Sequence, residues 1–187
     1  MGRAIERADF EAVWERTAST AVEDFNRNGE VSPKLFMLTL GDEPGEVRSF
    51  GVLDPALIHA FFKRETDHGK DAMAALLRLL LTPDSPMRKA MRKHGASPPD
   101  VLVQVNEAWV NNRQGKTKEQ VEAEYEKYGS VEAMPDRTEC VWIGLHTHGY
   151  STMGICPILD NPRRAEIGKL APPDGTFTGR FSMTSET

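Results

Sequence analysis

Apolar residues recur along this chain with two different periods, and these periods predict helices packed on a sheet. Residues 4–27 place apolar side chains at three- and four-residue steps, with charged side chains on the other face, which is the period of an amphipathic helix. The residues of the apolar face are Phe10, Val13, Trp14, Thr17, Ala21 and Phe25. Asn28-Gly29 supplies a left-handed residue that ends the helix. We expect this N-terminal element, residues 1–29, to cover a sheet, and the alternative is that it packs on a partner subunit.

Short apolar runs between turn-forming residues predict the strands. Residues 34–40 and 47–53 flank a turn rich in glycine, proline and acidic residues, so they predict a hairpin. The first run has little polar face, which favours a strand covered on both sides. Residues 101–105 are nearly all apolar and predict a buried strand that ends ahead of Glu107 and Trp109.

Further helices are predicted from their start and stop signals. Asp54-Pro55 has the pattern of an N-cap followed by proline, and residues 71–81 carry Met73, Leu76, Leu77 and Leu80 on one helical face. Ser85-Pro86 starts another helix that stops at Gly95, and a capping box at Thr117–Gln120 starts one that is closed by Gly129. The helix after Ser85 holds the most basic cluster of the chain, formed by Arg88, Lys89, Arg92, Lys93 and His94. Such a run is typical of a solvated helix face, and the alternative is contact with phosphates or an acidic partner.

Residues 139–146 and 150–159 predict a second hairpin around a histidine-bearing tip. A two-residue turn at His148-Gly149 and a three-residue loop from Thr147 to Gly149 both fit the sequence. We favour the loop because it sorts the apolar side chains onto one face. Its pairs are Val141 with Ile155, Ile143 with Met153, and Leu145 with Ser151; on the other face it pairs Cys140 with Cys156, Trp142 with Gly154 and His146 with Tyr150.

Together these elements predict a single domain of 187 residues with an α/β (α+β) fold. We expect a mixed, largely antiparallel sheet of about five strands with packed helices. Residues 163–169 could add one more strand, and residues 172–187, rich in Pro, Gly, Ser and Thr, are expected to be a loosely ordered tail.

Composition narrows the class of protein. Lys plus Arg number 23 and Asp plus Glu number 28, which gives a net charge of −5 and argues against a general nucleic-acid binder. No run approaches the length of a membrane helix, and the N-terminus lacks the apolar core of a secretory signal. The 2 cysteines are expected to be reduced thiols, so we expect a cytoplasmic protein that contacts neither nucleic acid nor membrane.

The hairpin tip contains a pattern that suggests metal chemistry. His146 and His148, followed by Asp160, resemble the His-x-His and downstream Asp of the JAMM (MPN-domain) metalloproteases. That resemblance implies a zinc site in which Glu107 supplies the acid/base. The chain departs from the family in three ways: Gly149 replaces its proline, Cys156 replaces its serine, and Asp160 lies one residue too far along. The segment that should enter a helix is also β-like, and no nucleotide-binding or serine-hydrolase motif is present.

A second resemblance fits the order of the motifs better. A strand ending in Glu107-Ala108-Trp109, followed by Pro135-Asp136-Arg137-Thr138-Glu139 before the next strand, is similar to an uncharacterised family of small bacterial and phage α/β proteins. It covers roughly residues 34–160 and carries no established activity. The resemblance implies that a ligand site, if present, involves Glu107, Trp109, Asp136, Arg137 and Glu139, and the alternative is that the last three form a salt-bridged turn.

Two classes of function remain open at this point. The first, which we favour, is a non-enzymatic binding or accessory protein that acts through protein–protein contacts, with a protein partner or a second copy docking on the N-terminal helix or a sheet face. It requires neither cofactor nor metal. The alternative is a small metal-dependent hydrolase that uses His146, His148, Asp160 and Glu107.

Overall fold

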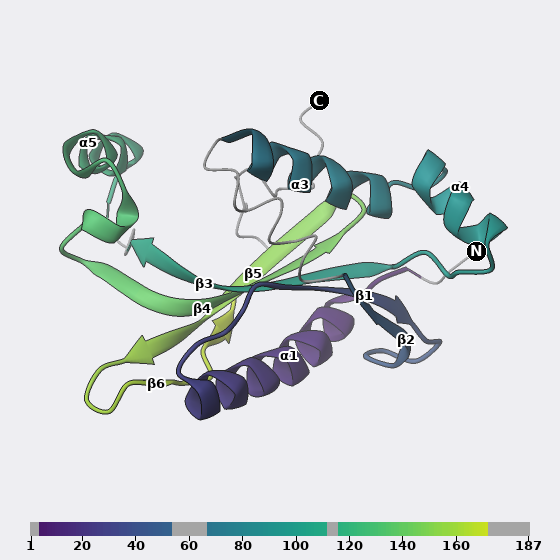
Figure 1. Cartoon of the computed structure of the whole chain (residues 1–187), viewed down its shortest axis with the longest axis horizontal. Coiled ribbons are helices and arrows are strands. Elements are labelled where there is room, and N and C mark those ends of the chain that lie inside the picture. The colour runs from purple at the N-terminus through teal and green to yellow at the C-terminus, as the bar shows by residue number, and fades with distance from the viewer. Residues whose placement is uncertain (1–3, 54–66, 112–115, 172–187) are drawn as a thin grey trace.

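The computed structural model describes residues 4–53, 67–111 and 116–171 and shows an antiparallel sheet between helices (Figure 1). The helices are α1 (Arg7–Asn28), α3 (Asp67–Leu81), α4 (Pro86–Lys93), α5 (Lys118–Tyr128) and the short 3-10 helix η1 (Val131–Ala133). The strands are β1 (Lys34–Leu40), β2 (Val47–Val52), β3 (Val101–Asn111), β4 (Arg137–Thr147), β5 (Tyr150–Leu159), β6 (Arg164–Ala165) and β7 (Lys169–Leu170). The predicted helix start at Asp54-Pro55 and the tail 172–187 lie outside the described residues.

The sheet confirms the mixed helix and strand class but is larger than predicted. Over the described residues it holds 7 strands in the order β2-β1-β3-β4-β5-β6, with β7 also paired to β5, in place of about five strands. All described pairs are antiparallel, so the sheet is not mixed. The strand count rises because the single strand expected at residues 163–169 is divided into β6 and β7, which pair with different parts of β5.

Helix α1 covers one face of the sheet, as its apolar periodicity predicts, and Figure 1 shows it on the side opposite α3. Buried residues of α1 pack on the strands, and Trp14, 5% exposed, lies over Gly154 of β5. The buried set on this face is Phe10, Val13, Trp14, Ala18, Ala21 and Phe25 against Val103, Val105, Val141, Ile143, Leu145 and Cys156. Gly29, in the left-handed conformation, ends the helix as expected.

Helix α3 covers part of the other face. Leu77 and Leu80 pack against Leu35 of β1 and Leu102 of β3 in a second apolar cluster. Strand β1 therefore has Leu35 toward α3 and Leu38 toward α1, so the prediction of a strand covered on both sides is confirmed. The side chain of Met73 lies outside the described residues.

The β4–β5 hairpin has the two-residue turn, and the three-residue loop we favoured is wrong. Thr147 pairs with Tyr150 across His148-Gly149, and Gly149 has φ +79°. In this register Val141 pairs with Cys156, Ile143 with Gly154, Leu145 with Thr152 and His146 with Ser151. The small residues Thr152 and Gly154 thus face α1, where they leave room for Trp14, and the bulkier Met153 and Ile155 turn to the other face.

Two further expectations about this region are also corrected by the pairing. Cys140 lies opposite Pro157 on the face away from α1, whereas Cys156 lies on the α1 face, so the two cysteines are not cross-strand partners. Trp142 lies over Gly144 of its own strand instead of Gly154. Both differences follow from the one-residue change of register, because it moves every side chain of β5 to the opposite face.

Strand β3 is longer than the apolar run that predicted it. It continues to Asn111, so Glu107 and Trp109 lie within the strand and not beyond its end. The continuation is held by antiparallel pairing with β4, in which Glu107 pairs with Val141 and Trp109 with Glu139. Polar side chains are tolerated here because this end of the sheet is only half-buried. Among the described residues, no helix is both long and apolar enough to cross a membrane.

Candidate functional site

Four of the five residues proposed from the second resemblance, all except Asp136, come together at one end of the sheet, past the end of α1. Trp109 and Glu139 are cross-strand partners, and the guanidinium of Arg137 stacks on the Trp109 ring at 4.9 Å. Glu107 lies on the same face and accepts a hydrogen bond from the backbone N–H of Val31. Side chains alternate between the two faces along a strand, so Glu107 and Trp109 share one face of β3, and Arg137 and Glu139 share one face of β4. Antiparallel pairing places these four side chains on the same face of the sheet.

Each charged member of this group already has a partner. Glu139 binds Arg163 at 2.5 Å, and Arg163 also donates to the carbonyl of Gly29, which ties β4 to the end of α1. The hydrogen bond to Glu139 is the main reason that the pKa of Arg163 is raised.

Asp136 lies in a separate cluster outside the sheet. It pairs with Lys116, which also binds Glu124 of α5 at 2.8 Å. The hydrogen bond to Lys116 lowers the pKa of Asp136 and that of Glu124, and the reciprocal bonds raise the pKa of Lys116. The carboxylates of Asp136 and Glu124 thus hold α5 and the lead-in to β4 together through Lys116. This is not the salt-bridged turn of Asp136, Arg137 and Glu139 that we considered as the alternative, because Arg137 stacks on Trp109 and Glu139 pairs with Arg163.

The four residues of the hydrolase alternative do not meet. His146 is completely buried on the face away from α1, whereas Glu107 lies on the α1 face near the opposite end of β4. His148 is exposed in the turn, and Asp160 follows the far end of β5. Within the described ranges, no group of three or more His, Cys, Asp and Glu side chains is placed to hold a metal ion. Because β3 and β4 are antiparallel, Glu107 lies opposite Val141 and His146 lies opposite Leu102, so the two residues are also separated along the strands.

Burial gives His146 and the cysteines a structural environment. Burial lowers the pKa of His146 to about 4, its Nδ1 shares a 3.0 Å hydrogen bond with Ser151 Oγ, and its buried Nε2 has no hydrogen-bond partner among the described residues. Burial raises the pKa of Cys140 to about 12 and also raises that of Cys156. A buried thiol is a poor nucleophile because the thiolate is the reactive species, so neither cysteine is suited to catalysis.

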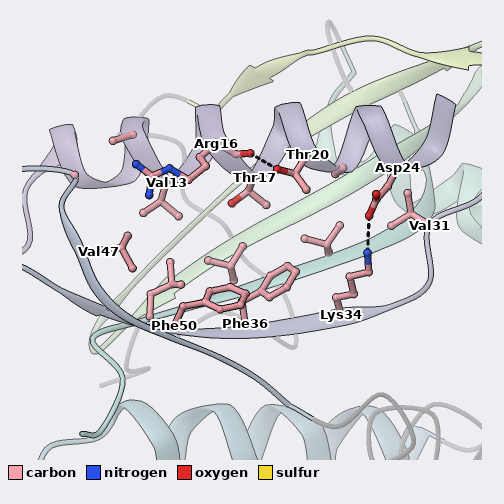
Figure 2. A pocket seen from close by; sticks show the side chains of 16 residues that line it. Val13, Arg16, Thr17, Thr20, Asp24, Val31, Lys34, Phe36, Val47 and Phe50 are labelled. Carbon is pink, nitrogen blue, oxygen red and sulfur yellow. Dashed lines mark hydrogen bonds and ion pairs between the residues drawn. The ribbon is translucent and has the colours of Figure 1, made fainter. Parts of the chain in front are cut away.

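An opening lies between α1 and strands β1, β2 and β3, and we call it the α1 groove. Its volume is about 400 Å³, within the range of ligand sites. Figure 2 shows Val13, Thr17 and Thr20 pointing into it from α1, and Phe36 and Phe50 facing them from the strands. The walls are mainly apolar. The groove is present because α1 packs closely on β4 and β5 but leaves the β1–β2 side of the sheet incompletely covered.

Polar groups stand at the margins of the α1 groove. Lys34 and Asp24 form a 2.7 Å ion pair at one end, shown as a dashed line in Figure 2. Thr20 donates its hydroxyl hydrogen to the backbone carbonyl of Arg16. The exposed guanidinium of Arg16 forms no ion pair with any of the described side chains. The groove thus combines apolar walls with one uncompensated positive charge.

The open side of the α1 groove is the edge strand β2. Within the described part of the chain, β2 pairs only with β1, so its other edge has backbone groups free to pair. Phe50 is 62% exposed and Val52 45%, and both lie on the groove face because they are two residues apart in a strand. Natural edge strands are normally protected by charge or cover, so an exposed apolar edge is a sign of binding.

The sequence contained a weak signal of this site. Val47, Phe50 and Val52 interrupt a short polar run, and we treated them only as a hairpin strand. The groove itself depends on how far α1 extends over the sheet, which no local pattern encodes. No family model matches the chain, and comparisons with curated proteins and with solved structures also found no match, so the site is judged on its own geometry.

Proposed function

We propose that this protein is a non-enzymatic binding protein that holds an extended segment of a partner protein. The segment adds to the free edge of β2 as a further antiparallel or parallel strand and places an apolar side chain in the α1 groove. The observation that carries the proposal is the exposed pair Phe50 and Val52, on an edge strand that borders an apolar groove. Recognition by strand addition draws affinity from backbone hydrogen bonds and specificity from pockets for alternate side chains.

The position of the groove supports a strand as the occupant. A strand added to β2 would lie about 4.8 Å beyond it, with every second side chain on the face of Phe50. Those side chains would enter the space between β2 and α1, where Phe36 and Phe50 already form a tilted aromatic contact at 5.3 Å. The partner's apolar residue would therefore meet an aromatic wall on one side and the methyl groups of Val13 and Thr17 on the other.

Charge favours a different protein over a second copy of this chain. An acidic group on the partner would complement Arg16, and β2 itself has none to offer in a symmetric pairing. The nearest acid, Glu46, already accepts hydrogen bonds from the backbone of Asp42 and Glu43. We therefore expect the bound segment to combine apolar residues at alternate positions with an acidic residue near Arg16.

Selection from a random peptide library on the full-length protein tests this proposal. Selected peptides are expected to carry that pattern, and isothermal titration calorimetry should show at least about tenfold weaker binding to Phe50→Ser. Ile167→Ser is the matched control, because Ile167 is 58% exposed but does not line the groove. Arg16→Gln should weaken peptides that contain the acid and leave their amide counterparts unchanged.

Backbone N-methylation of the peptide separates strand addition from a simple apolar contact. Methylation at alternate residues removes donors to β2 and should abolish binding, whereas methylation at the intervening residues should be tolerated. Binding that is insensitive to Phe50→Ser and to N-methylation would refute the proposal. Concentration-dependent dimerisation lost in Phe50→Ser would assign the edge to a second copy, and a lipid retained in native mass spectrometry would assign the groove to a small molecule; either result overturns the proposal.

A further inference from the structure

A second pocket, separate from the α1 groove, lies where three parts of the chain meet. The start of α1, the segment from the end of α3 through α4 to β3, and the tip of the β4–β5 hairpin surround a space of about 320 Å³. We call it the tip pocket. It shares no lining residue with the α1 groove. It brings the basic helix α4 and the histidine-bearing turn, two features singled out in the sequence, to the same place.

Arg88 supplies a fixed positive charge to the tip pocket. Its Nη1 donates to the carbonyls of Leu80, at 3.0 Å, and Pro99, at 2.6 Å, so the side chain is held between the end of α3 and the loop before β3. The Nε atom is buried without a hydrogen-bond partner, and no ion pair reaches Arg88 from the described side chains. Arg88 lines the pocket, and its charge is balanced by no ion pair with a described side chain, so a ligand carboxylate is the group that would complement it.

Asp100 supplies a fixed negative charge to the same pocket. Its Oδ2 accepts a 2.9 Å hydrogen bond from the backbone N–H of Leu40, and its own N–H donates to Leu38, which locks it against β1. Burial lowers the pKa of Arg88, the neighbouring Arg92 adds to that effect, and Asp100 opposes it. Arg88 and Asp100 thus lie within electrostatic range of each other, yet each is held by backbone groups and they form no ion pair within 4.0 Å.

The remaining wall of the tip pocket combines apolar and aromatic side chains with the polar Thr147 and His148 of the hairpin tip. Phe10 and Tyr150 meet edge to face at 5.1 Å, and Leu81 and Pro83 line the side nearest α3. A ligand in this space would have two opposite charges on one side and apolar contacts on the other.

We propose that the tip pocket binds a free amino acid with an apolar side chain. The carboxylate pairs with Arg88, the ammonium group pairs with Asp100, and the side chain packs against Phe10 and Leu81. A simple anion would gain Arg88 but be repelled by Asp100, and a simple cation would meet the reverse, because like charges at short range in a partly buried site are unfavourable. A zwitterion satisfies both charges at once, and the volume of about 320 Å³ is sufficient for a molecule of this size.

Calorimetric titration of the full-length protein with L-leucine and L-phenylalanine tests the proposal. Each amino acid is compared with its N-acetyl derivative, which keeps only the carboxylate, and its amide, which keeps only the ammonium group. The blocked forms are expected to bind at least about tenfold more weakly, because each loses one charge-assisted contact.

Variants connect this selectivity to the two residues. Arg88→Met should weaken binding of the free amino acid about tenfold or more, whereas Arg92→Met, on the same helix but outside the pocket, should leave binding unchanged. Asp100→Asn keeps an acceptor for Leu40 and so preserves the fold even where Arg88→Met does not. It should remove the preference for the free amino acid over its N-acetyl form.

Four results would overturn the assignment. They are failure of both amino acids to bind at millimolar concentration, equal or tighter binding of the N-acetyl form to the wild-type protein, equal or tighter binding of the amide, and an equal loss in Arg92→Met and Arg88→Met. The second result would identify a plain anion site, and the fourth would show a general effect of charge on α4.

Discussion

Substitution of Gly154 by alanine tests both the packing of α1 and the register of the second hairpin. A Cβ at this position would lie 2.4 Å from two ring atoms of Trp14 and 2.8 Å from the carbonyl oxygen of Lys169. Ordinary contacts begin near 3.4 Å, so the indole would have to move by about 1 Å, and the strand β7 behind it would have to shift as well. Trp14 is 5% exposed and surrounded by core residues, so it has little space into which to move.

Overpacking of this kind costs about 1–3 kcal/mol, and the backbone contact with Lys169 places Gly154→Ala near the upper end. For a protein of this size we expect the midpoint of thermal unfolding to fall by roughly 5–10 °C. Gly51→Ala is the matched control, since it is also a strand glycine but its nearest neighbour is the terminal methyl of Met37 at 3.4 Å. That variant should be neutral or more stable by about 0.5 kcal/mol, because alanine restricts the unfolded chain more than glycine does.

Urea denaturation followed by tryptophan fluorescence measures both variants, and a double-mutant cycle with Trp14→Leu identifies the cause. In the Trp14→Leu background, Gly154→Ala should cost at least about 1 kcal/mol less than in the wild-type protein, with the contact to Lys169 accounting for the remainder. Wild-type stability of Gly154→Ala would refute the reasoning. It is the result expected from the three-residue loop, in which Gly154 turns away from α1.

Four other predictions follow from the site geometry. Burial lowers the pKa of His146 from 6.5 to about 4, so its contribution to stability is complete above pH 6.5 and declines by about 3 kcal/mol as the pH falls to 4. In urea titrations, His146→Gln should flatten this dependence of the unfolding free energy on pH, whereas His148→Gln should not. An unchanged pH dependence in His146→Gln would contradict the burial. Glu107→Ala should destabilise the fold by about 1–3 kcal/mol because it leaves the N–H of Val31 unpaired, whereas Glu107→Gln keeps an acceptor and most of the stability; equal losses would assign the effect to charge. Cys140 and Cys156 lie on opposite faces, so diamide treatment should give no intramolecular disulfide in peptide mapping of the folded protein, and a rapid cross-link would show that the register is wrong. Both thiols should react with Ellman's reagent only after unfolding, because burial raises their pKa values, and fast reaction of the native protein would contradict that environment.

The sequence predicted the structure best where an interaction between residues close in sequence determines it. The ends of α1, α4 and α5 were predicted because Gly29, Ser85 and the Thr117–Gln120 capping box satisfy backbone groups at those positions. Strand β1 was predicted as covered on both sides because its apolar residues leave no polar face. In each case the determining interaction lies within a few residues of the element it defines.

The predictions were wrong where contacts between distant parts of the chain determine the structure. The register of β4 and β5 depends on Trp14, more than a hundred residues away, which needs the space over Gly154. Strand β3 continues through Glu107 and Trp109 because β4 pairs with it, although the local sequence turns polar. The α1 groove and the tip pocket are formed by segments that are remote in sequence, so Phe50 and Arg88 were read as an ordinary strand residue and as part of a basic helix face.

The contact between Asn26 and Ala165 has a consequence for synthesis of the protein. The side chain of Asn26 donates to the Ala165 carbonyl at 3.1 Å and accepts from its N–H at 2.8 Å, across 139 residues of chain. On the ribosome, α1 emerges before all of the strands that complete its docking site, and β6 emerges long after it. Its apolar face therefore stays uncovered until those strands have been made, because native contacts of such long range must wait for the whole intervening chain. Chaperone binding to the nascent chain should be concentrated on α1 and released once residue 165 has left the exit tunnel.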